Sequence, residues 1–252
     1  MVRIPLALQL YSIRDDCARD LPGCLAAVAK MGYEGVEFAG YCGFSAQDVR
    51  KMLDDNGLKC CGTHIGIDTL LGDELEKTSE FNKVIGNDFL IVPGLPGEYT
   101  ASAAAWRRTA DVFNQVADRL RPLGQWTGYH NHHTEFTPFP DCGEEPWHLF
   151  FGNTKKEVVM QFDTGNAMHG GADPVPYFER YPGRALTVHL KEFSATNDTA
   201  LIGEGDCPWS RLFELCETIG ATQWYIVEQE SYPYPPMECA ERCIQNLRGM
   251  GK

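Results

Sequence analysis

The apolar positions of the chain follow one pattern that recurs along its length: an amphipathic segment, a glycine, and a short apolar run. In the first instance Leu21, Leu25 and Val28 share one face of a helix predicted over residues 20–31. The apolar run 35–38 follows this helix and predicts a strand. The change of period from helix to strand indicates an alternating α/β chain.

The same pattern predicts further helices and strands in alternation. Helices are expected over 45–56, 70–85, 106–120, 208–219 and 237–247, with others between the last strands. Strands are expected over 5–11, 35–38, 58–64, 89–92, 126–130, 158–162, 185–190 and 224–228. Ser45, followed three residues later by Asp48, resembles a capping box at the start of the second helix.

Eight strands that alternate with helices in 252 residues predict a closed (β/α)8 barrel, the TIM barrel, as a single domain over 1–252. Gly32, Gly57, Gly86 and Gly124 end four of the predicted helices and stand 25, 29 and 38 residues apart, close to the length of one βα unit. An open doubly wound sheet is the alternative. It is less favoured because no GxGxxG or P-loop motif follows the first strand.

The amino-acid composition indicates which binding partners and which cellular compartment to expect. The 22 Lys and Arg against 35 Asp and Glu give a formal charge of −13, which argues against binding to nucleic acid or to an anionic membrane surface. No apolar run approaches the roughly 18 residues of a transmembrane helix. The ten cysteines are scattered without a CxxC pair, which favours buried thiols in a reducing compartment, and therefore the cytoplasm.

Chemistry-bearing residues stand where the predicted strands end, which is where a TIM barrel builds its active site. They are Gln9, Tyr11, Glu37, His64, the run 129–135 (YHNHHTE), Asp163, His189, Lys191, Glu228 and Glu230. Any one of them alone is explained by solvation at the surface. Together they converge on one small space, where crowded carboxylates raise one another's pKa unless a cation is present.

Glu135, Asp163, His189 and Glu228 are the predicted ligands of one divalent metal ion. Three carboxylates and one imidazole suit Mn²⁺, which we expect first, and Mg²⁺ or Co²⁺, better than they suit a structural zinc site; Zn²⁺ stays an alternative. The spacing does not decide whether Glu228 or Glu230 is the ligand after the last strand.

Acid–base candidates flank these ligands. His130 and His132 alternate along a strand and so face one side, where one can act as a base while the other binds substrate. His189 and Lys191 share a face in the same way. The predicted catalytic residues are His130, His132, Lys191, Glu135 and Glu228, and the predicted substrate-binding residues are Gln9, Tyr11, Glu37, His64, Asn166 and Glu230.

Six strings in the chain resemble the sugar phosphate isomerase/epimerase family of xylose isomerase-like barrels, in the right order from the first strand to the last. They are LQLYSIRD at 8–15, GYHNH at 128–132, FDTGN at 162–166, VHLKE at 188–192, GEG at 203–205 and IVEQ at 226–229. The resemblance implies one divalent metal held by Glu135, Asp163, His189 and Glu228, and chemistry at a C–H bond beside a carbonyl. A carbohydrate substrate follows from it, and a homo-oligomer is compatible with it.

The chain departs from the ketose epimerases of this superfamily at the fifth strand. Those enzymes carry there a glutamate that is both ligand and base, whereas this chain has His130, and Glu135 comes five residues later. The leading hypothesis is a metal-dependent isomerase or epimerase of a sugar or hydroxy-ketone. The alternative is a metal-dependent lyase or dehydratase that performs β-elimination on a keto-sugar or 3-keto-glycoside, with His130 or His132 as the base and Lys191 or a bound water as the acid.

Two other classes are disfavoured. A DNA-repair enzyme like endonuclease IV, which shares the fold, conflicts with the charge of −13. A sugar-binding protein without catalysis has no need of the ligand set.

Overall fold

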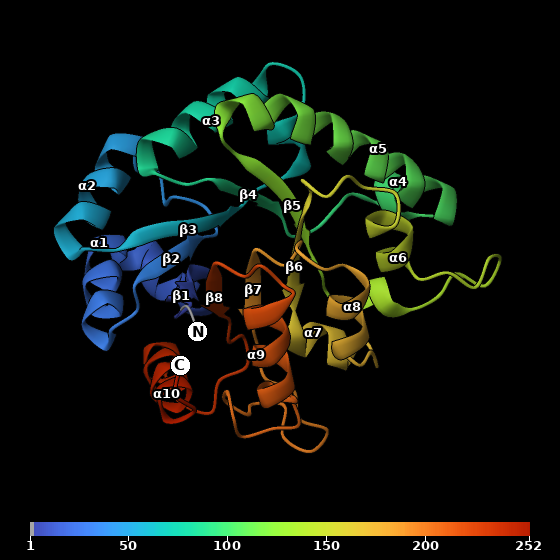
Figure 1. The fold of residues 1–252 in the computed structure, drawn as a ribbon. Coiled ribbons are helices and arrows are strands. Elements are labelled where there is room, and N and C mark those ends of the chain that lie inside the picture. Colours follow the sequence, from blue (N-terminus) through green and yellow to red (C-terminus); the bar gives the residue numbers. More distant parts are fainter. Residues whose placement is uncertain (1–2) are drawn as a thin grey trace.

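The computed structural model describes residues 3–252 as a closed barrel of eight parallel strands, each hydrogen-bonded to the next along the chain. The strands are β1 (Leu6–Gln9), β2 (Gly35–Phe38), β3 (Lys59–His64), β4 (Phe89–Val92), β5 (Trp126–His130), β6 (Val159–Asp163), β7 (Thr187–Leu190) and β8 (Trp224–Val227). Ala7 of β1 pairs with Ile226 of β8 and closes the ring. The predicted single-domain (β/α)8 barrel is confirmed (Figure 1).

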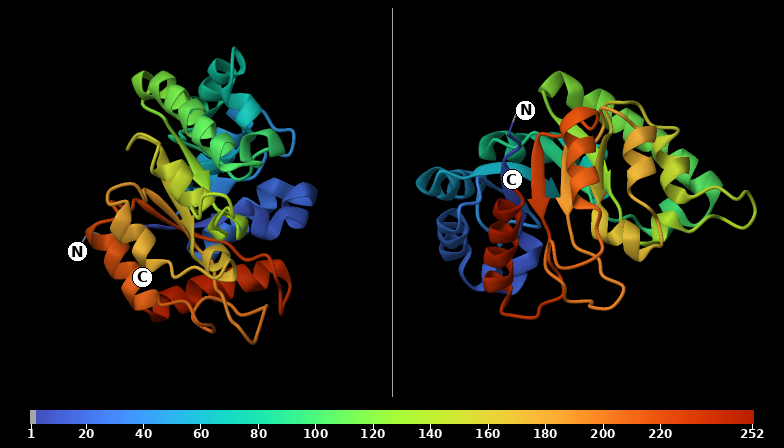
Figure 2. Two further views of the ribbon diagram at one scale, coloured as in Figure 1. Left: turned by 90° about the vertical axis from the view of Figure 1, so that its right-hand side faces the viewer. Right: turned by 60° about the horizontal axis from the view of Figure 1, so that its bottom comes forward.

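Helices surround the strands on the outside, as two further views show (Figure 2). They are α1 (Arg14–Met31), α2 (Ala46–Asn56), α3 (Glu74–Ile85), α4 (Gly97–Thr100), α5 (Ala103–Leu120), α6 (Pro146–Phe151), α7 (Thr164–His169), α8 (Val175–Arg180), α9 (Trp209–Thr218) and α10 (Pro236–Gly249). Short 3₁₀ turns lie at η1 (Leu10–Ile13), η2 (Ile67–Leu70), η3 (Arg121–Leu123) and η4 (Thr134–Phe136). Within residues 3–252, no helix combines the length and the apolar character needed to cross a bilayer.

The start of α1 differs from the prediction for a local reason. The helix begins at Arg14, and Asp20 interrupts it with φ −154° and ψ 77°. The Asp20 carboxylate then accepts a hydrogen bond from Gly23 N at 2.9 Å. The sequence signal at residue 20 therefore marks a second start within a kinked helix.

The first strand is shorter than predicted. Gln9 ends it, because its side-chain oxygen accepts a hydrogen bond from Tyr11 N at 3.0 Å and so begins the η1 turn. Tyr11 consequently lies on the rim of the barrel, outside the strand, with 43% of its surface exposed.

The cap predicted for α2 is present. Ser45 Oγ accepts a hydrogen bond from Asp48 N at 3.2 Å, and the helix ends at Gly57, whose φ of 64° lies in the left-handed region that favours glycine. Such helix ends, each followed by a strand, are the origin of the glycine spacing in the sequence.

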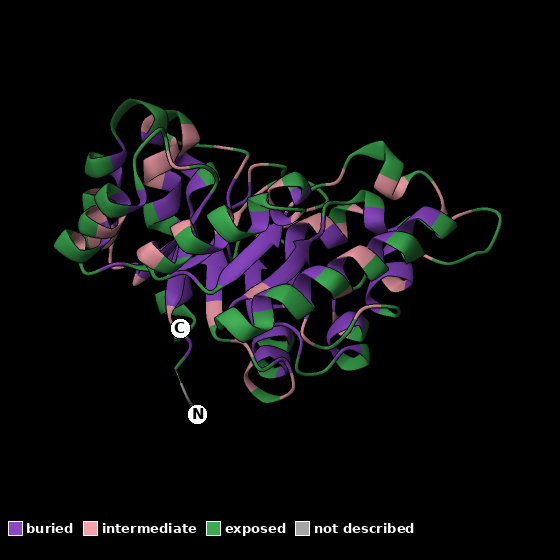
Figure 3. Cartoon of the chain, turned by 90° about the horizontal axis from the view of Figure 1, so that it is seen from above, coloured by how far each residue is buried: buried purple, intermediate pink, exposed green. Residues whose placement is uncertain are grey.

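Apolar side chains form one large core between the strands and the helices, and the outer faces of the helices are exposed (Figure 3). Two small separate clusters come from the strands, with members such as Ile91 and Val159 in one and Ala7 and Ile226 in the other. Polar side chains that are almost fully buried continue these strands towards their carboxyl ends. The barrel therefore has an apolar base and a polar upper layer.

All ten cysteines are free thiols, and of these only Cys42 and Cys142 are exposed. Burial raises the pKa of Cys60 and of Cys243 to about 12, so these thiols stay protonated at neutral pH. A thiol without its thiolate form is a poor nucleophile.

Iodoacetamide is therefore expected to label two thiols in the native protein and the other eight only after denaturation. Mass spectrometry of the intact protein before and after addition of urea measures this difference. The Cys42→Ser/Cys142→Ser double variant is the control, and it should take up no label while folded. Rapid labelling of a third site would contradict the burial of the remaining thiols.

Candidate metal and active site

Glu37 is the centre of a buried hydrogen-bond network at the carboxyl ends of the strands. Its Oε2 accepts hydrogen bonds from Gln9 Nε2 at 2.8 Å and lies 2.5 Å from His189 Nε2. Its Oε1 accepts a hydrogen bond from Gln161 Nε2 at 2.7 Å. His64 Nε2 lies 3.2 Å from the same carboxylate. One carboxylate thus joins four strands besides its own.

Space for this carboxylate comes from the neighbouring strand β3. A Cβ atom built on Gly62 would lie 2.3 Å from Glu37 Oε1. The register between β2 and β3 also shifts at Val36 and Glu37, where the ladder has an irregularity. The missing side chain of Gly62 is therefore what lets Glu37 extend into the barrel.

Both nitrogens of the His189 ring face carboxylates. Nδ1 lies 2.5 Å from Glu228 Oε2 and 3.9 Å from Asp163 Oδ2, while Nε2 faces Glu37. Burial alone would lower the pKa of His189, but the carboxylates of Glu37 and Glu228 raise it to about 10. A charged imidazole therefore neutralises the centre of the site in the metal-free protein.

Four buried side chains could hold a metal ion. One ligand atom from each of His130, Asp163, His189 and Glu228 lies within 4.8 Å of the others. His64 forms a second, overlapping group with the imidazoles of His130 and His189. Asp163, His189 and Glu228 are three of the four ligands predicted from the sequence.

Two atoms of this cluster are buried without a hydrogen-bond partner in residues 3–252. They are His130 Nδ1 and Asp163 Oδ2. Burial raises the pKa of Asp163, and burial together with His189 and His64 lowers that of His130 well below its ordinary value. Because unpaired buried polar atoms are costly, a neutral imidazole and a carboxylate that each have an atom without a partner in one cluster fit a bound cation.

Glu135 does not belong to this cluster, contrary to the expectation from the sequence. Its Oε1 accepts a hydrogen bond from Tyr129 Oη at 2.7 Å, and its Oε2 accepts one from the backbone N–H of His132 at 2.9 Å. The η4 turn that carries Glu135 folds the carboxylate back along β5 towards Tyr129, which is buried among the helices. His130, which the sequence suggested as a base, is the fourth member of the cluster instead of Glu135.

A cavity of about 490 Å³ opens above the cluster, and we call it the central cavity. It is lined by Tyr11, His64, His130, His132, Glu228 and Glu230, together with uncharged residues of the loops after β2, β3 and β4. Gln9 and Glu37, predicted to bind substrate, are fully buried and do not line it. Asn166 lies elsewhere, on the wall of a neighbouring cavity.

Lys191 and Glu230 form an ion pair at one side of the central cavity. Burial alone would lower the pKa of Lys191, but Glu228, Asp163 and Glu230 raise it. Lys191 therefore keeps its proton and its charge at neutral pH. His132 is exposed and also lines this cavity, with its ring centre 5.3 Å from that of His130.

The sequence analysis assigned no role to two residues that order the site. Gln161 donates to Glu37 and accepts from His64 Nε2 at 2.7 Å. Asn131 bridges β5 and β6, because its side chain accepts from Asp163 N at 2.8 Å and donates to Asp163 O at 3.0 Å. The strand alternation that pointed to Asp163 could also have indicated Gln161, two residues earlier on the same face.

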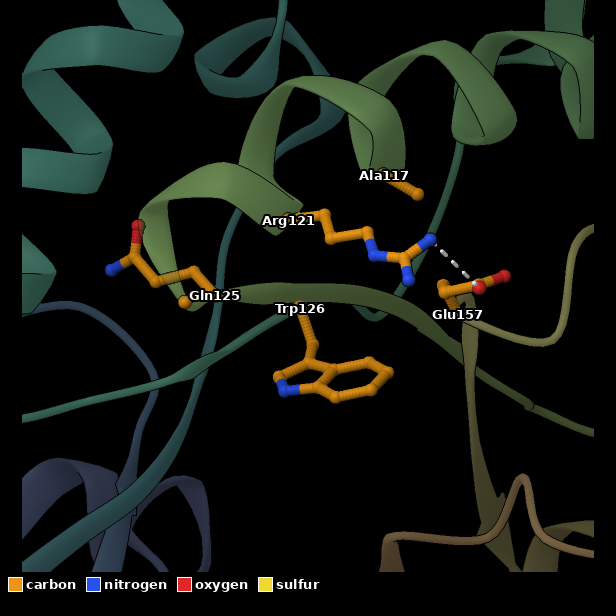
Figure 4. A pocket seen from close by; sticks show the side chains of 6 residues that line it. Ala117, Arg121, Gln125, Trp126 and Glu157 are labelled. Atoms are coloured by element: carbon orange, nitrogen blue, oxygen red, sulfur yellow. Dashed lines mark hydrogen bonds and ion pairs between the residues drawn. The ribbon is translucent and has the colours of Figure 1, made fainter.

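A second pocket lies at the opposite, amino-terminal end of β5 (Figure 4). Its charged side chains, Arg121 and Glu157, are paired with each other at 3.3 Å above the ring of Trp126. Residues at that end of a TIM barrel usually contribute to stability, whereas the chemistry occurs at the carboxyl ends of the strands. The central cavity is therefore the candidate active site.

Comparisons with known proteins found similar sequences and structures. A model of the xylose isomerase-like TIM barrel family matches residues 25–249. An inosose dehydratase of Geobacillus kaustophilus is 25% identical over an alignment of 267 positions, which covers 88% of this chain and 86% of that protein. A structure described as a sugar phosphate isomerase/epimerase, from Parabacteroides distasonis, superposes with a TM-score of 0.84 at 25% identity and covers 98% of each chain.

A third similar structure, of the IolI protein, holds a zinc atom. It superposes with a TM-score of 0.74 over 98% of this chain and 96% of that one. At 15% identity it shows the shared fold alone.

Proposed function

The chain belongs to the xylose isomerase-like TIM barrel family, and from this premise we propose that it is a divalent-metal-dependent lyase that eliminates water or an alcohol from a polyhydroxy ketone. The similarity to an inosose dehydratase over most of both chains supports a cyclic substrate of this kind. A small carbohydrate in the cytoplasm remains our expectation for substrate and location.

His130, Asp163, His189 and Glu228 would hold the metal ion in this proposal. Two imidazoles and two carboxylates suit Mn²⁺, our first expectation, and they also suit Co²⁺ and Zn²⁺, for which imidazole is a good ligand. Glu37 would support the site from behind, since a ligating histidine commonly donates its other N–H to a carboxylate. A divalent cation in this place polarises a substrate carbonyl and makes the adjacent C–H bond more acidic.

Two different acid–base groups stand at or next to the wall of the central cavity. His132 lines the cavity, and Glu135 holds its backbone N–H, so its imidazole can take the proton from the carbon next to the carbonyl. Lys191 is paired with Glu230, which lines the same cavity, and its ammonium group can give a proton to the oxygen that leaves as water or an alcohol.

The ion pair between Lys191 and Glu230, next to the metal-binding cluster, is the observation that carries the proposal. Exchange of a proton between two faces of one carbon requires a base on each face, and an ammonium group cannot be the second base. It can stabilise the negative charge that develops on a leaving oxygen. The arrangement therefore favours elimination over epimerisation.

Isomerisation is the second candidate. Proton abstraction next to a carbonyl is common to both reactions, and a single base can return the proton to the neighbouring carbon. The similarity to a structure described as a sugar phosphate isomerase/epimerase supports it.

Incubation of the metal-loaded protein with an inosose in D₂O tests the proposal. We expect mass spectrometry to show the loss of one water from the substrate. For His132→Gln, we expect the rate of this loss to fall about 10²- to 10⁴-fold. The neighbouring His133→Gln variant is the matched control and should keep the rate. An isomeric product that loses no water and is heavier only by the deuterium taken up from the solvent would establish isomerisation instead.

A further inference from the structure

The two ring nitrogens of His64 have different surroundings. Nε2 points into the buried network, where it lies 2.7 Å from Gln161 Oε1 and 3.2 Å from Glu37 Oε2. Within residues 3–252, Nδ1 has no hydrogen-bond partner, and it is not one of the fully buried atoms that lack one. Because His64 lines the central cavity, Nδ1 is the ring nitrogen that a ligand can reach.

The orientation of the Gln161 amide follows from its buried neighbours. Its Nε2 donates hydrogen bonds to Glu37 Oε1 at 2.7 Å and to Thr187 Oγ1 at 3.0 Å. A carboxylate without a proton can only accept, so the reversed amide would place its oxygen against another acceptor. Gln161 Oε1 therefore faces His64, and both atoms next to His64 Nε2 are acceptors. This arrangement requires a proton on Nε2.

The neighbouring histidine ring favours a neutral His64. The rings of His64 and His189 are stacked, with 5.2 Å between their centres and 9° between their planes. His189 is charged in the metal-free protein and is a proposed ligand of the metal ion, so a second positive charge on His64 would be repelled. In a neutral imidazole with its proton on Nε2, Nδ1 is a hydrogen-bond acceptor.

We propose that His64 is a specificity-determining residue, whose Nδ1 accepts a hydrogen bond from a hydroxyl group of the substrate, and that Gln161 is a positioning residue that keeps this nitrogen an acceptor. A hydroxyl group fits this place because it can donate, whereas a fluorine atom there cannot. The inference rests on the proposed function for the polyhydroxylated ring, but the position of the proton and the preference for a donor are measured without any reaction.

A long-range ¹H–¹⁵N NMR spectrum of the Zn²⁺-loaded protein with ¹⁵N-labelled histidines tests the position of the proton. The signals of His64 are those that disappear in His64→Gln. We expect a protonated Nε2 and an unprotonated Nδ1. Gln161→Met offers Nε2 no acceptor from position 161, so a fraction of the other tautomer should appear. Thr187→Val leaves Gln161 Oε1 in place, and its spectrum should show no such fraction.

Calorimetric titration of the same Zn²⁺-loaded protein with myo-inositol and its monofluorinated analogues tests the preference for a donor. At one ring position, replacement of the hydroxyl group by fluorine should lower the affinity about tenfold or more. In His64→Gln this loss should fall below about twofold, because the new amide can still contact Gln161 but leaves no acceptor in the place of Nδ1. His133→Gln, a change outside the central cavity, is the matched control and should keep the full loss.

A proton or a Zn²⁺ ion on Nδ1 of His64 in the unmodified protein would overturn the inference. So would an absence of polyol binding, or a fluorine effect that is the same in His64→Gln at every ring position. An unchanged spectrum for Gln161→Met would reject the role of Gln161. The proposed function fails separately, if the metal-loaded protein neither dehydrates an inosose nor exchanges its proton with D₂O. A fluorine effect that depends on His64 without that reaction would keep the acceptor and reject the lyase.

Discussion

Asp163→Asn is expected to remove metal binding and activity while the fold is retained. Asp163 Oδ1 caps α7 by accepting a hydrogen bond from Asn166 N at 2.6 Å, and asparagine caps helices as well as aspartate does. The substitution therefore affects mainly Oδ2, the unpartnered oxygen that faces His189. Replacing this oxygen by an NH₂ group removes a ligand and places a donor in the cluster.

The expected loss of metal affinity is more than about 100-fold, because even a residue behind the ligands commonly contributes 10- to 100-fold. Loss of several kcal/mol of carbonyl polarisation corresponds to about 10³-fold in rate. Metal content by plasma mass spectrometry and turnover of the loaded protein measure the two effects. Asp173→Asn, an exposed position that accepts a hydrogen bond from Val175 N, is the control. A variant at 163 that retains one equivalent of metal would exclude the proposed site.

Glu37→Gln is expected to weaken both the fold and the metal site. The carboxylate accepts hydrogen bonds from Gln9 and Gln161 and faces His189, so an amide NH₂ in place of one oxygen meets a donor. A buried donor left without an acceptor costs about 1–3 kcal/mol. The contact between His189 Nε2 and the side chain at 37 orients the ring of His189, and the substitution weakens this contact. Metal affinity should therefore fall about 10- to 100-fold.

Urea unfolding of the metal-free protein and titration with Mn²⁺ measure the two losses. Glu34→Gln removes a carboxylate that is paired with Arg3 at the surface, and it should change the free energy of unfolding by less than about 0.5 kcal/mol. If Glu37→Gln binds Mn²⁺ as tightly as the unmodified protein, Glu37 has no role in orienting His189.

Most of the fold could be predicted from the sequence because a parallel barrel repeats one local unit. The change between helical and strand periods, together with capping residues such as Ser45 and Gly57, indicates each unit without reference to distant residues. The kink of α1 at Asp20 and the early end of β1 at Gln9 were not predicted. Both depend on a side chain that bonds its own backbone, which competes with the regular pattern.

The sequence indicated which residues form the site more accurately than it indicated how these residues are arranged. Asp163, His189 and Glu228 lie at strand ends, where direction follows from alternation, and they do come together. Glu135 lies on a turn beyond its strand, where alternation no longer fixes direction, and a hydrogen bond to Tyr129 takes it away. Glu37 was expected to contact substrate, but its position depends on the small size of Gly62 on another strand.

That dependence couples the evolution of two positions far apart in the chain. A methyl group at position 62 would lie 2.3 Å from Glu37 Oε1, so an alanine there requires the Glu37 carboxylate to leave its hydrogen bonds or a shorter side chain at 37. The pair should consequently vary together among relatives, with glycine at 62 wherever a glutamate stands at 37. A redesign of this barrel for a bulkier substrate would have to replace Glu37 and Gly62 together, because replacing either one alone disrupts the site.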